Sequence, residues 1–262
     1  MSRNQPQQHG TDGSAVSRND SVKTAARTLQ VFETFADCQQ PLSLSELARR
    51  IDMPVSSSHA LLKTLQNFGY VYVLEQRKLV YPTKRLLQVA EAIAVRDPLL
   101  ETLAPIINQL RDELGETVIV GKRQTASVVY LEVIEGTHTV RYAARPGDTK
   151  PLHSSAIGKA MLGQLTPDAL LTLLKRSSLP AVTGRTITDR AALIDEINRS
   201  RERGWYMTCG ENVDDVAAIA VASEVYGETV GLAVAGPANR MTRELDRYTS
   251  ALRAYGDRLQ ES

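Results

Sequence analysis

The chain has 262 residues, of which 42% are apolar and 23% charged, with a formal net charge of +1. This composition predicts a globular chain of one large or two small domains and excludes a polycation. We find neither an apolar run of about 18 residues nor an apolar N-terminal stretch, so we expect no membrane-spanning helix and no secretory signal. Two distant cysteines, Cys38 and Cys209, exclude a disulfide framework and favour a reduced, cytoplasmic protein.

The charge is unevenly distributed along the chain. Residues 1–97 hold 12 Lys and Arg against 9 Asp and Glu, whereas the remainder holds 19 against 21. Within Pro54–Arg85 five basic residues accompany a single acid, Glu75. A local basic patch on a near-neutral chain is typical of a small nucleic-acid-binding module joined to a second domain. Chance clustering on a solvated surface gives the same pattern, so the predicted helices and strands are needed to distinguish the two interpretations.

The N-terminal third predicts three helices after a polar tail. Residues 1–19 offer little to bury, and we expect them to be disordered. From Ser21 apolar residues recur every three or four positions, which predicts a first helix. Ser43 and Glu46 have the spacing of a capping box and begin a second, short helix. Pro54 suits the first position of a third helix that runs to about Asn67.

The predicted third helix has two contrasting faces. One face is mainly apolar and includes Ser58, Leu61, Leu62, Leu65 and Phe68. The other face carries no acid and only short or hydrogen-bonding groups, namely Ser56, His59, Ala60, Lys63 and Asn67. Such a face can enter a major groove and meet base edges, whereas an ordinary surface helix would usually carry Glu as well.

A basic hairpin and a further helix follow. Tyr70–Leu74 and Leu79–Tyr81 are rich in β-prone residues, and Arg77 and Lys78 lie between them. Three helices followed by such a hairpin predict a winged helix-turn-helix, in which the third helix reads DNA and the hairpin contacts phosphates. We therefore expect a DNA-binding domain over residues 20–82 and a linker helix over residues 83–97.

The remainder, residues 98–262, contains segments with the periodicity of helices and segments with the periodicity of strands. The expected helices are Leu99–Leu114, Ser155–Gly163, Thr166–Leu174, Asp189–Arg203 and Met241–Leu259. The expected strands are Thr117–Lys122, Val128–Ile134, Thr139–Ala143, Tyr206–Cys209, Val216–Val225 and Thr229–Ala235. Antiparallel strands flanked by helices predict an α+β domain of the kind that senses ligands.

Five segments, taken together in order, resemble the IclR family of bacterial transcriptional regulators. They are SVKTAARTL at Ser21–Leu29, LSELARRIDMPVSSSHALLKTL at Leu44–Leu65, PLHSSAIGKAML at Pro151–Leu162, RGWYMTCGE at Arg203–Glu211 and AVAGPANR at Ala233–Arg240. The resemblance implies a winged helix-turn-helix, a linker helix and a C-terminal GAF-like effector-binding domain. It also implies a homodimer on double-stranded operator DNA that can pair into a tetramer, and control of catabolic operons by small organic acids or aromatic compounds.

The chain departs from the family pattern in both halves. Ala60 and Thr24 stand where the family usually has Arg, and Lys63 lies on the same helix face as Ala60, where it could compensate for the lost charge. Family members that sense very small oxoacids place a Cys and two hydroxyl residues in the pocket. The matching positions here are Ala218, Ala233 and Ala235. These small apolar groups predict a roomier pocket with fewer hydrogen-bonding partners.

Two sets of candidate site residues follow. For DNA binding they are Ser56, Ser57, His59, Lys63, Asn67, Arg77 and Lys78. For effector binding, by resemblance, they are Tyr142, Ser155, Ala156, Ile157, Thr208, Val216, Ala218, Ala233 and Ala235. The predicted helix start at Ser155 adds a physical reason, because the free amides of a helix N-terminus bind carboxylates. The alternative is that the Ala and Val positions are ordinary core.

The sequence contains no complete motif for catalysis, metal binding or cofactor binding. Lys159 follows a glycine, but the phosphate-loop pattern fails at His153 and Ala160. His153 beside two serines lacks a nucleophile elbow, and we expect it to be structural or to orient a ligand. The four His and two Cys have no metal-ligand spacing, and Asp214 with Asp215 predicts a solvated turn. A DNA-binding regulator is therefore favoured over a small-acid-metabolising enzyme or an architectural DNA-binding protein.

Overall fold

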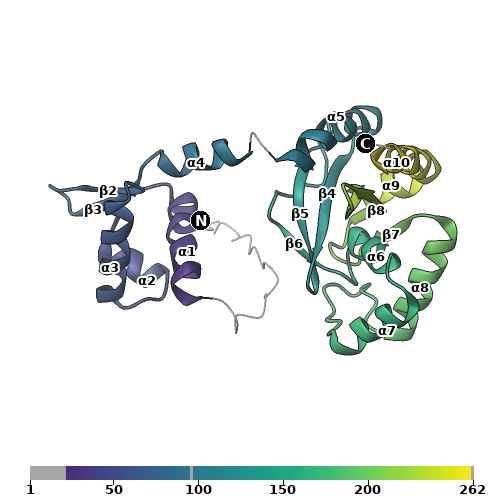
Figure 1. Ribbon diagram of the computed structural model, residues 1–262, viewed down its shortest axis with the longest axis horizontal. Helices are drawn as coiled ribbons and strands as arrows, with labels where there is room; N and C mark the ends of the chain where they lie inside the picture. Colours follow the sequence, from purple (N-terminus) through teal and green to yellow (C-terminus); the bar gives the residue numbers. More distant parts are fainter. Residues whose placement is uncertain (1–21, 95–96, 261–262) are drawn as a thin grey trace, which may run out of the picture. The chain divides into compact units, whose positions relative to one another are not determined.

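The structure is a computed structural model, and it describes residues 22–94 and 97–260. The expected disordered tail at residues 1–19 lies outside the described residues. The chain divides into two units, one ending at Asp97 and the other beginning at Pro98 (Figure 1). Each unit has its own buried core, and we describe them separately.

The first unit contains the expected three helices and hairpin. Its elements are α1 (Lys23–Cys38), β1 (Leu42–Ser43), α2 (Leu44–Arg50), α3 (Val55–Asn67), β2 (Val71–Leu74), β3 (Leu79–Pro82) and α4 (Arg85–Ala94). The strands form an antiparallel sheet in the order β1-β3-β2, so the hairpin gains a short third strand that the sequence did not predict. The core contains Val31, Phe35, Leu47, Leu62 and Leu65 from the helices and Val71 and Val80 from the hairpin.

The helix ends follow the predicted chemistry with two differences. The Ser43 hydroxyl accepts the backbone N–H of Glu46 at 3.2 Å and caps α2. Glu46 does not complete the capping box, because its carboxylate pairs with Arg50 instead. Pro54 is the residue before α3 rather than its first residue. Phe68, which the helical period places on the mainly apolar face, is 65% exposed although its amide still donates to the Thr64 carbonyl at 3.1 Å.

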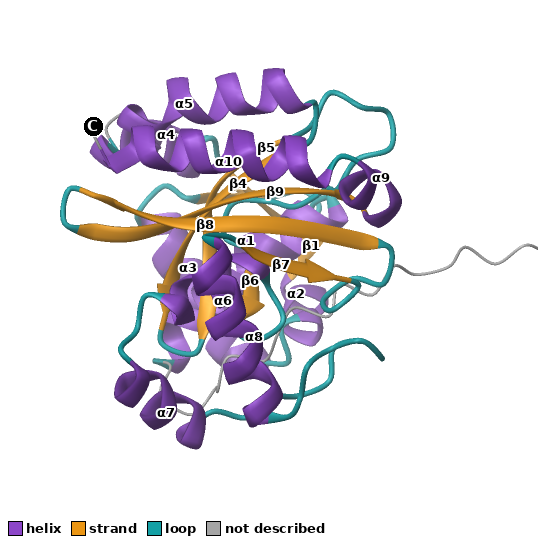
Figure 2. Ribbon diagram, turned by 90° about the vertical axis from the view of Figure 1, so that its right-hand side faces the viewer, coloured by secondary structure: helices purple, strands orange, loops and turns teal. Residues whose placement is uncertain are grey.

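The second unit is a six-stranded antiparallel sheet with helices on both faces (Figure 2). Its strands are β4 (Thr117–Gln124), β5 (Ser127–Ile134), β6 (Thr149–Pro151), β7 (Tyr206–Cys209), β8 (Val216–Val225) and β9 (Glu228–Pro237), in the order β6-β5-β4-β9-β8-β7. Its helices are α5 (Pro98–Leu114), α6 (Ala156–Gly163), α7 (Pro167–Arg176), α8 (Arg190–Arg203), α9 (Ala238–Arg243) and α10 (Leu245–Gln260). The predicted α+β class is correct.

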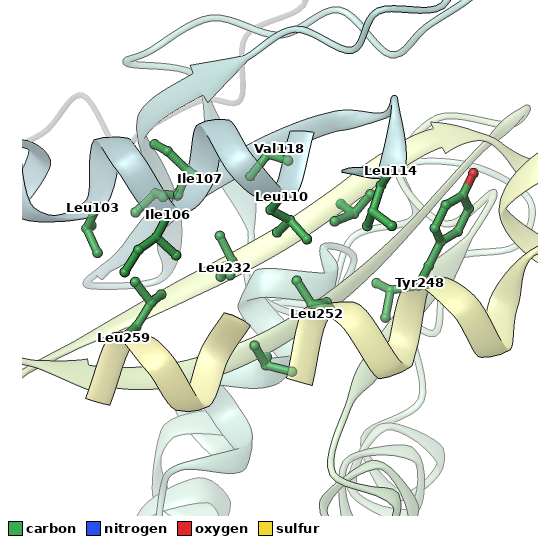
Figure 3. Packing of buried hydrophobic residues seen from close by; sticks show 14 of the residues in the cluster. Leu103, Ile106, Ile107, Leu110, Leu114, Val118, Leu232, Tyr248, Leu252 and Leu259 are labelled. Atoms are coloured by element: carbon green, nitrogen blue, oxygen red, sulfur yellow. The ribbon is translucent and has the colours of Figure 1, made fainter. Parts of the chain in front are cut away.

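The two faces of this sheet carry side chains of different size. On β9, Val230, Leu232 and Val234 point to the face covered by α5 and α10, where large apolar side chains interlock (Figure 3). The alternating residues Gly231, Ala233 and Ala235 point to the opposite face, where α6 packs. A side chain at Gly231 would place its Cβ 2.4 Å from Cγ2 of Ile157. Small residues therefore let the buried helix α6 approach the strands closely.

Two predicted elements of the second unit are wrong. Thr139–Ala143 is not a strand, because side chains take its carbonyls: Thr117 donates to the Tyr142 oxygen at 2.6 Å and Arg240 to the Val140 oxygen at 2.9 Å. The place beside β5 is filled by β6, which the sequence did not predict. The expected single C-terminal helix is two helices, α9 and α10, which break at Glu244.

Candidate functional site

The predicted DNA-binding face is an exposed surface of α3 and the hairpin tip. Ser56, Ser57, His59, Lys63, Asn67, Arg77 and Lys78 are all exposed. The opposite face of α3 supplies Leu62 and Leu65 to the core and thereby fixes which side of the helix is presented. Glu75 is the one acid at the hairpin tip, and α3 carries none. The arrangement presents cations and small polar groups in a form suited to a nucleic-acid backbone and groove.

The cations of this face are not neutralised from within. Lys63, Arg77 and Lys78 form no ion pair with any carboxylate in the described part of the chain. The turn that carries the hairpin cations is closed by the Arg77 amide, which donates to the Leu74 carbonyl at 3.0 Å. The hairpin tip is thus an ordered basic turn whose charges are available to phosphates.

The nine predicted effector residues line one cavity in the second unit. The cavity lies between the N-terminus of α6 and the small-residue face of the sheet. Its lining includes Tyr142, Ser155, Ala156, Ile157, Thr208, Val216, Ala218, Ala233 and Ala235. Four further residues also line it, namely Ile119, Tyr130, Asn212 and Val213. Five neighbouring strands, β5, β4, β9, β8 and β7, contribute to its floor.

The start of α6 presents free backbone donors to this cavity. The Ser155 hydroxyl accepts the Gly158 amide at 3.1 Å and donates to the Pro151 carbonyl at 2.9 Å. The amides of Ala156 and Ile157 meet no acceptor within the described residues. Unpartnered amides at the positive end of a helix form a ready site for a carboxylate.

Two tyrosines supply the polar groups of another part of the wall. Burial raises the pKa of Tyr130, and the neighbouring Tyr142 hydroxyl raises it further. Burial also raises the pKa of Tyr142. Both phenols therefore stay protonated at neutral pH and can donate or accept a hydrogen bond. The lining between these hydroxyls and the amides of α6 is largely apolar.

The cavity is narrow. Its volume is about 30 Å³, room for about two water molecules at the usual minimum of about 10–15 Å³ each. Ala233 and Ala235 are 2% and 1% exposed, so the floor is well packed, whereas Val213 is 41% exposed and lies in the loop Gly210–Asp215 between β7 and β8. A six-membered ring would enter only if part of the wall moved.

Four of the lining residues could not be predicted from the sequence, because the patterns around them are weak. Ile119 pairs with Ala233 across β4 and β9, so the alternation of the two strands places both side chains on the same face of the sheet. Tyr130 lies on β5, where a buried tyrosine is usually core. Asn212 and Val213 lie in a loop without periodicity, and only its position after β7 draws attention to it. Contact between distant segments brought them to the cavity.

The remaining singled-out residues lie beside the cavity. Lys159 is buried and its Nζ contacts Glu211 Oε1 at 2.7 Å, which is not an arrangement that binds phosphate. His153 is buried with Nε2 2.9 Å from the Pro180 oxygen, and burial lowers its pKa. Asp214 and Asp215 are exposed in the loop before β8, as a solvated turn would be. Residues 22–94 and 97–260 contain no group of three metal-ligating side chains and no helix that could cross a membrane.

Comparison with known proteins points to one family for both units. The family model described as bacterial transcriptional regulator IclR C-terminal matches residues 91–261, and the IclR helix-turn-helix domain matches residues 24–75. The HTH-type transcriptional regulator BhcR of Paracoccus denitrificans is 30% identical over 223 residues, which are 84% of this chain and 80% of the relative.

Solved structures show the same fold. The crystal structure of the Thermotoga maritima IclR has a TM-score of 0.77 at 22% identity and covers 92% of this chain and 98% of its own. An IclR homologue from Microbacterium hydrocarbonoxydans, crystallised with 4-hydroxybenzoate, has a TM-score of 0.70 at 22% identity and covers 91% of this chain and 100% of its own.

Proposed function

This chain belongs to the IclR family of bacterial transcriptional regulators, and we propose that it binds operator DNA through α3 and the hairpin β2–β3 under the control of a small aromatic acid. The exposed, acid-free face of α3 is the observation that carries the DNA-binding part. The operator belongs to a catabolic operon in this proposal, and the protein works in the cytoplasm, where bacterial DNA lies.

In the proposed interface α3 enters the major groove. Ser56, Ser57, His59 and Asn67 would meet base edges, because they project from the exposed face of the reading helix. Lys63 would supply the charge that the family usually places at the position of Ala60. Arg77 and Lys78 would hold the flanking phosphates, which contribute affinity but no sequence preference.

The proposed effector is a carboxylate with an aromatic or other apolar body. The carboxylate would accept the free amides of Ala156 and Ile157, with Thr208 as a side-chain donor. The ring would cover Val216 and the three alanines, at about 25 cal/mol per Å² of apolar surface buried. A two- or three-carbon oxoacid would find few partners there, at a cost of about 1–3 kcal/mol per unpaired polar group. The complex of the Microbacterium protein supports the proposal to the extent that this fold accommodates such an acid.

We further propose that the working form is a homodimer, which can pair into a tetramer. A single winged helix reads too few base pairs, and two half-sites about one turn apart supply the missing affinity and specificity. Helix α4 has no buried residue and exposes Leu86, Leu87, Val89 and Ile93. The residues expected from the sequence in this contact are Ala90, Ile93, Ala94 and Val95, together with the first helix. The first three are exposed, and Val95 lies outside the described residues.

A gel shift tests the function as a whole. The probes are DNA fragments from upstream of its own gene and of the flanking genes, each with and without benzoate or 4-hydroxybenzoate. A specific shift that the acid weakens or strengthens is expected. Calorimetry against pyruvate, glyoxylate, benzoate and hydroxybenzoates then identifies the class of acid. Turnover of any of these acids without a DNA shift would favour an enzyme, and a shift insensitive to all acids would favour an architectural role.

A further inference from the structure

A buried ion pair joins two walls of the cavity. Lys159 lies on α6, all eight residues of which are buried, and its side chain is 1% exposed. Its Nζ donates to Glu211 Oε1 at 2.7 Å and to the Met207 carbonyl at 3.2 Å. Glu211 belongs to the loop between β7 and β8. The pair therefore connects the helix whose first turn carries Ala156 and Ile157 to the loop that carries Asn212 and Val213.

This pair is a poor device for stability alone. Removing two charges from water offsets most of their attraction, and apolar residues of similar volume often do as well. Glu211 Oε2 is buried and meets no hydrogen-bond partner among the described residues, which is a further cost of burying the pair. What the ion pair adds over an apolar contact is direction, because it fixes one residue of the loop to one point on the helix.

The loop is also fixed from its outer side. The Thr186 hydroxyl donates to the Glu211 carbonyl at 2.7 Å, and the Thr183 hydroxyl donates to the Gly210 carbonyl at 2.6 Å. Glu211 is thus held by its side chain and its backbone at once. Asn212 and Val213, the next two residues, line the cavity. Asn212 is also held by its own side chain, whose Nδ2 donates to Ser154 Oγ at 3.1 Å. The ion pair and this bond together position the loop beside the first turn of α6.

We propose that the Lys159–Glu211 ion pair sets the upper size limit of the acid that the effector cavity accepts. Helix α6 is buried on all sides, so the loop with the half-exposed Val213 is the wall that yields to a ring. The ion pair limits how far this loop moves from α6. Lys159 and Glu211 are positioning residues in this proposal, which rests on the proposed effector site.

The test compares the wild type with the double variant Lys159→Met and Glu211→Leu, which replaces the pair with apolar side chains. The control is Lys122→Met with Glu228→Leu, which removes an exposed ion pair of 2.8 Å in the same unit. Hydrogen exchange is read at the amides of Gly210 and Val216, which bond to the Val216 and Val213 carbonyls. Calorimetry measures the affinities for 2-naphthoate and benzoate, and thermal unfolding reports stability.

In the double variant we expect Tm within about 5 °C of the wild type. The exchange rate at the two amides rises at least about tenfold. The ratio of 2-naphthoate to benzoate affinity also rises about tenfold, because a more mobile loop excludes the larger acid less strongly. The control variant changes neither. A folded double variant with wild-type exchange and ratio would overturn the proposal, as would an equal loss of protection throughout the domain.

Two further outcomes are also decisive. If the double variant does not fold, Glu211→Gln replaces it, because the amide keeps an acceptor for Lys159 but weakens the bond. Exchange at Gly210 and Val216 must then still rise, and unchanged exchange rejects the proposal. If the wild type binds no acid at all, the proposed effector fails, whereas the exchange measurement still decides whether the pair positions the loop.

Discussion

At the scale of single residues, three alanines decide what the cavity floor offers a ligand. Ala218, Ala233 and Ala235 lie side by side on β8 and β9, because Ala218 pairs with Ala235 and Ala220 with Ala233 in the ladder. Their small size has two effects. It lets α6 pack closely, and it leaves the cavity floor flat and free of hydrogen-bonding side chains. An apolar ring suits such a floor better than a small polar acid.

A larger side chain on this floor should weaken acid binding. Ala235→Leu adds three carbons beside the amides of α6, and we expect affinity for an aromatic acid to fall at least tenfold while operator binding without acid is retained. Overpacking costs about 1–3 kcal/mol and lowers Tm by several degrees. Ala220→Leu is the matched control, since Ala220 is equally buried but does not line the cavity. Equal affinity losses in both variants would place the acid elsewhere.

A second residue-scale prediction concerns acid stability. Burial lowers the pKa of His153 below its ordinary value of 6.5, and the nearby Lys159 charge lowers it further. The unfolded chain therefore binds this proton more readily than the folded one. His153 should cost stability as pH falls below about 6.5, with a slope of up to about 1.4 kcal/mol per pH unit, down to its folded pKa.

The measurement is urea unfolding of the wild type and His153→Gln at pH 8, 6.5 and 5.5. The glutamine stays neutral and can still donate to the Pro180 carbonyl. We expect the variant to gain stability relative to the wild type only at the acidic values. Burial raises the pKa of Glu211, which acts with the opposite sign but is common to both proteins and cancels in the comparison. A constant difference across the pH range would contradict the burial effect on His153.

At the scale of elements, the hairpin β2–β3 tests whether the basic patch contacts DNA. Arg77→Gln with Lys78→Gln removes two charges from an exposed turn without touching the core. We expect weaker binding to all sequences and a log–log salt slope smaller by up to about two. Ser56→Ala should instead change sequence preference and leave the slope unchanged. An unchanged affinity and slope in the double variant would remove the hairpin from the interface.

Elements with strong periodicity could be predicted from the sequence, and those made by contacts could not. The period of α3 and the alternation of β8 reflect one buried face each, so their residues alone define them. Thr139–Ala143 has the composition of a strand, yet side chains of Thr117 and Arg240 occupy its carbonyls. The short strands β1 and β6 are defined by their pairing with β3 and β5 and have no periodicity of their own that predicts them. The cavity shows the same difference. Nine of its residues could be predicted from the family resemblance, whereas Asn212 and Val213 reach it only because a loop folds against it.

At the scale of the whole molecule, two units with separate cores are consistent with one unit for DNA binding and one for acid binding. The first unit carries the exposed cations of α3 and the hairpin tip, and the second carries the cavity. An acid can control DNA binding only if its binding free energy differs between two arrangements of the protein. A dimer offers such arrangements, because the spacing of its two reading helices must match the two half-sites.

The dimer is tested through α4. Leu87 and Ile93 are 54% and 70% exposed on a helix without buried residues, and a stable dimer needs such apolar area covered. We expect light scattering at low micromolar concentration to give at least twice the 28.8 kDa of one chain. Leu87→Glu with Ile93→Glu should shift this towards the single chain and weaken operator binding, because half-sites are then bound independently. Val182→Glu, at a residue 44% exposed in the other unit, serves as the control. A wild type that scatters as 28.8 kDa would reject the dimer, and an unchanged mass in the double variant would reject α4 as its contact.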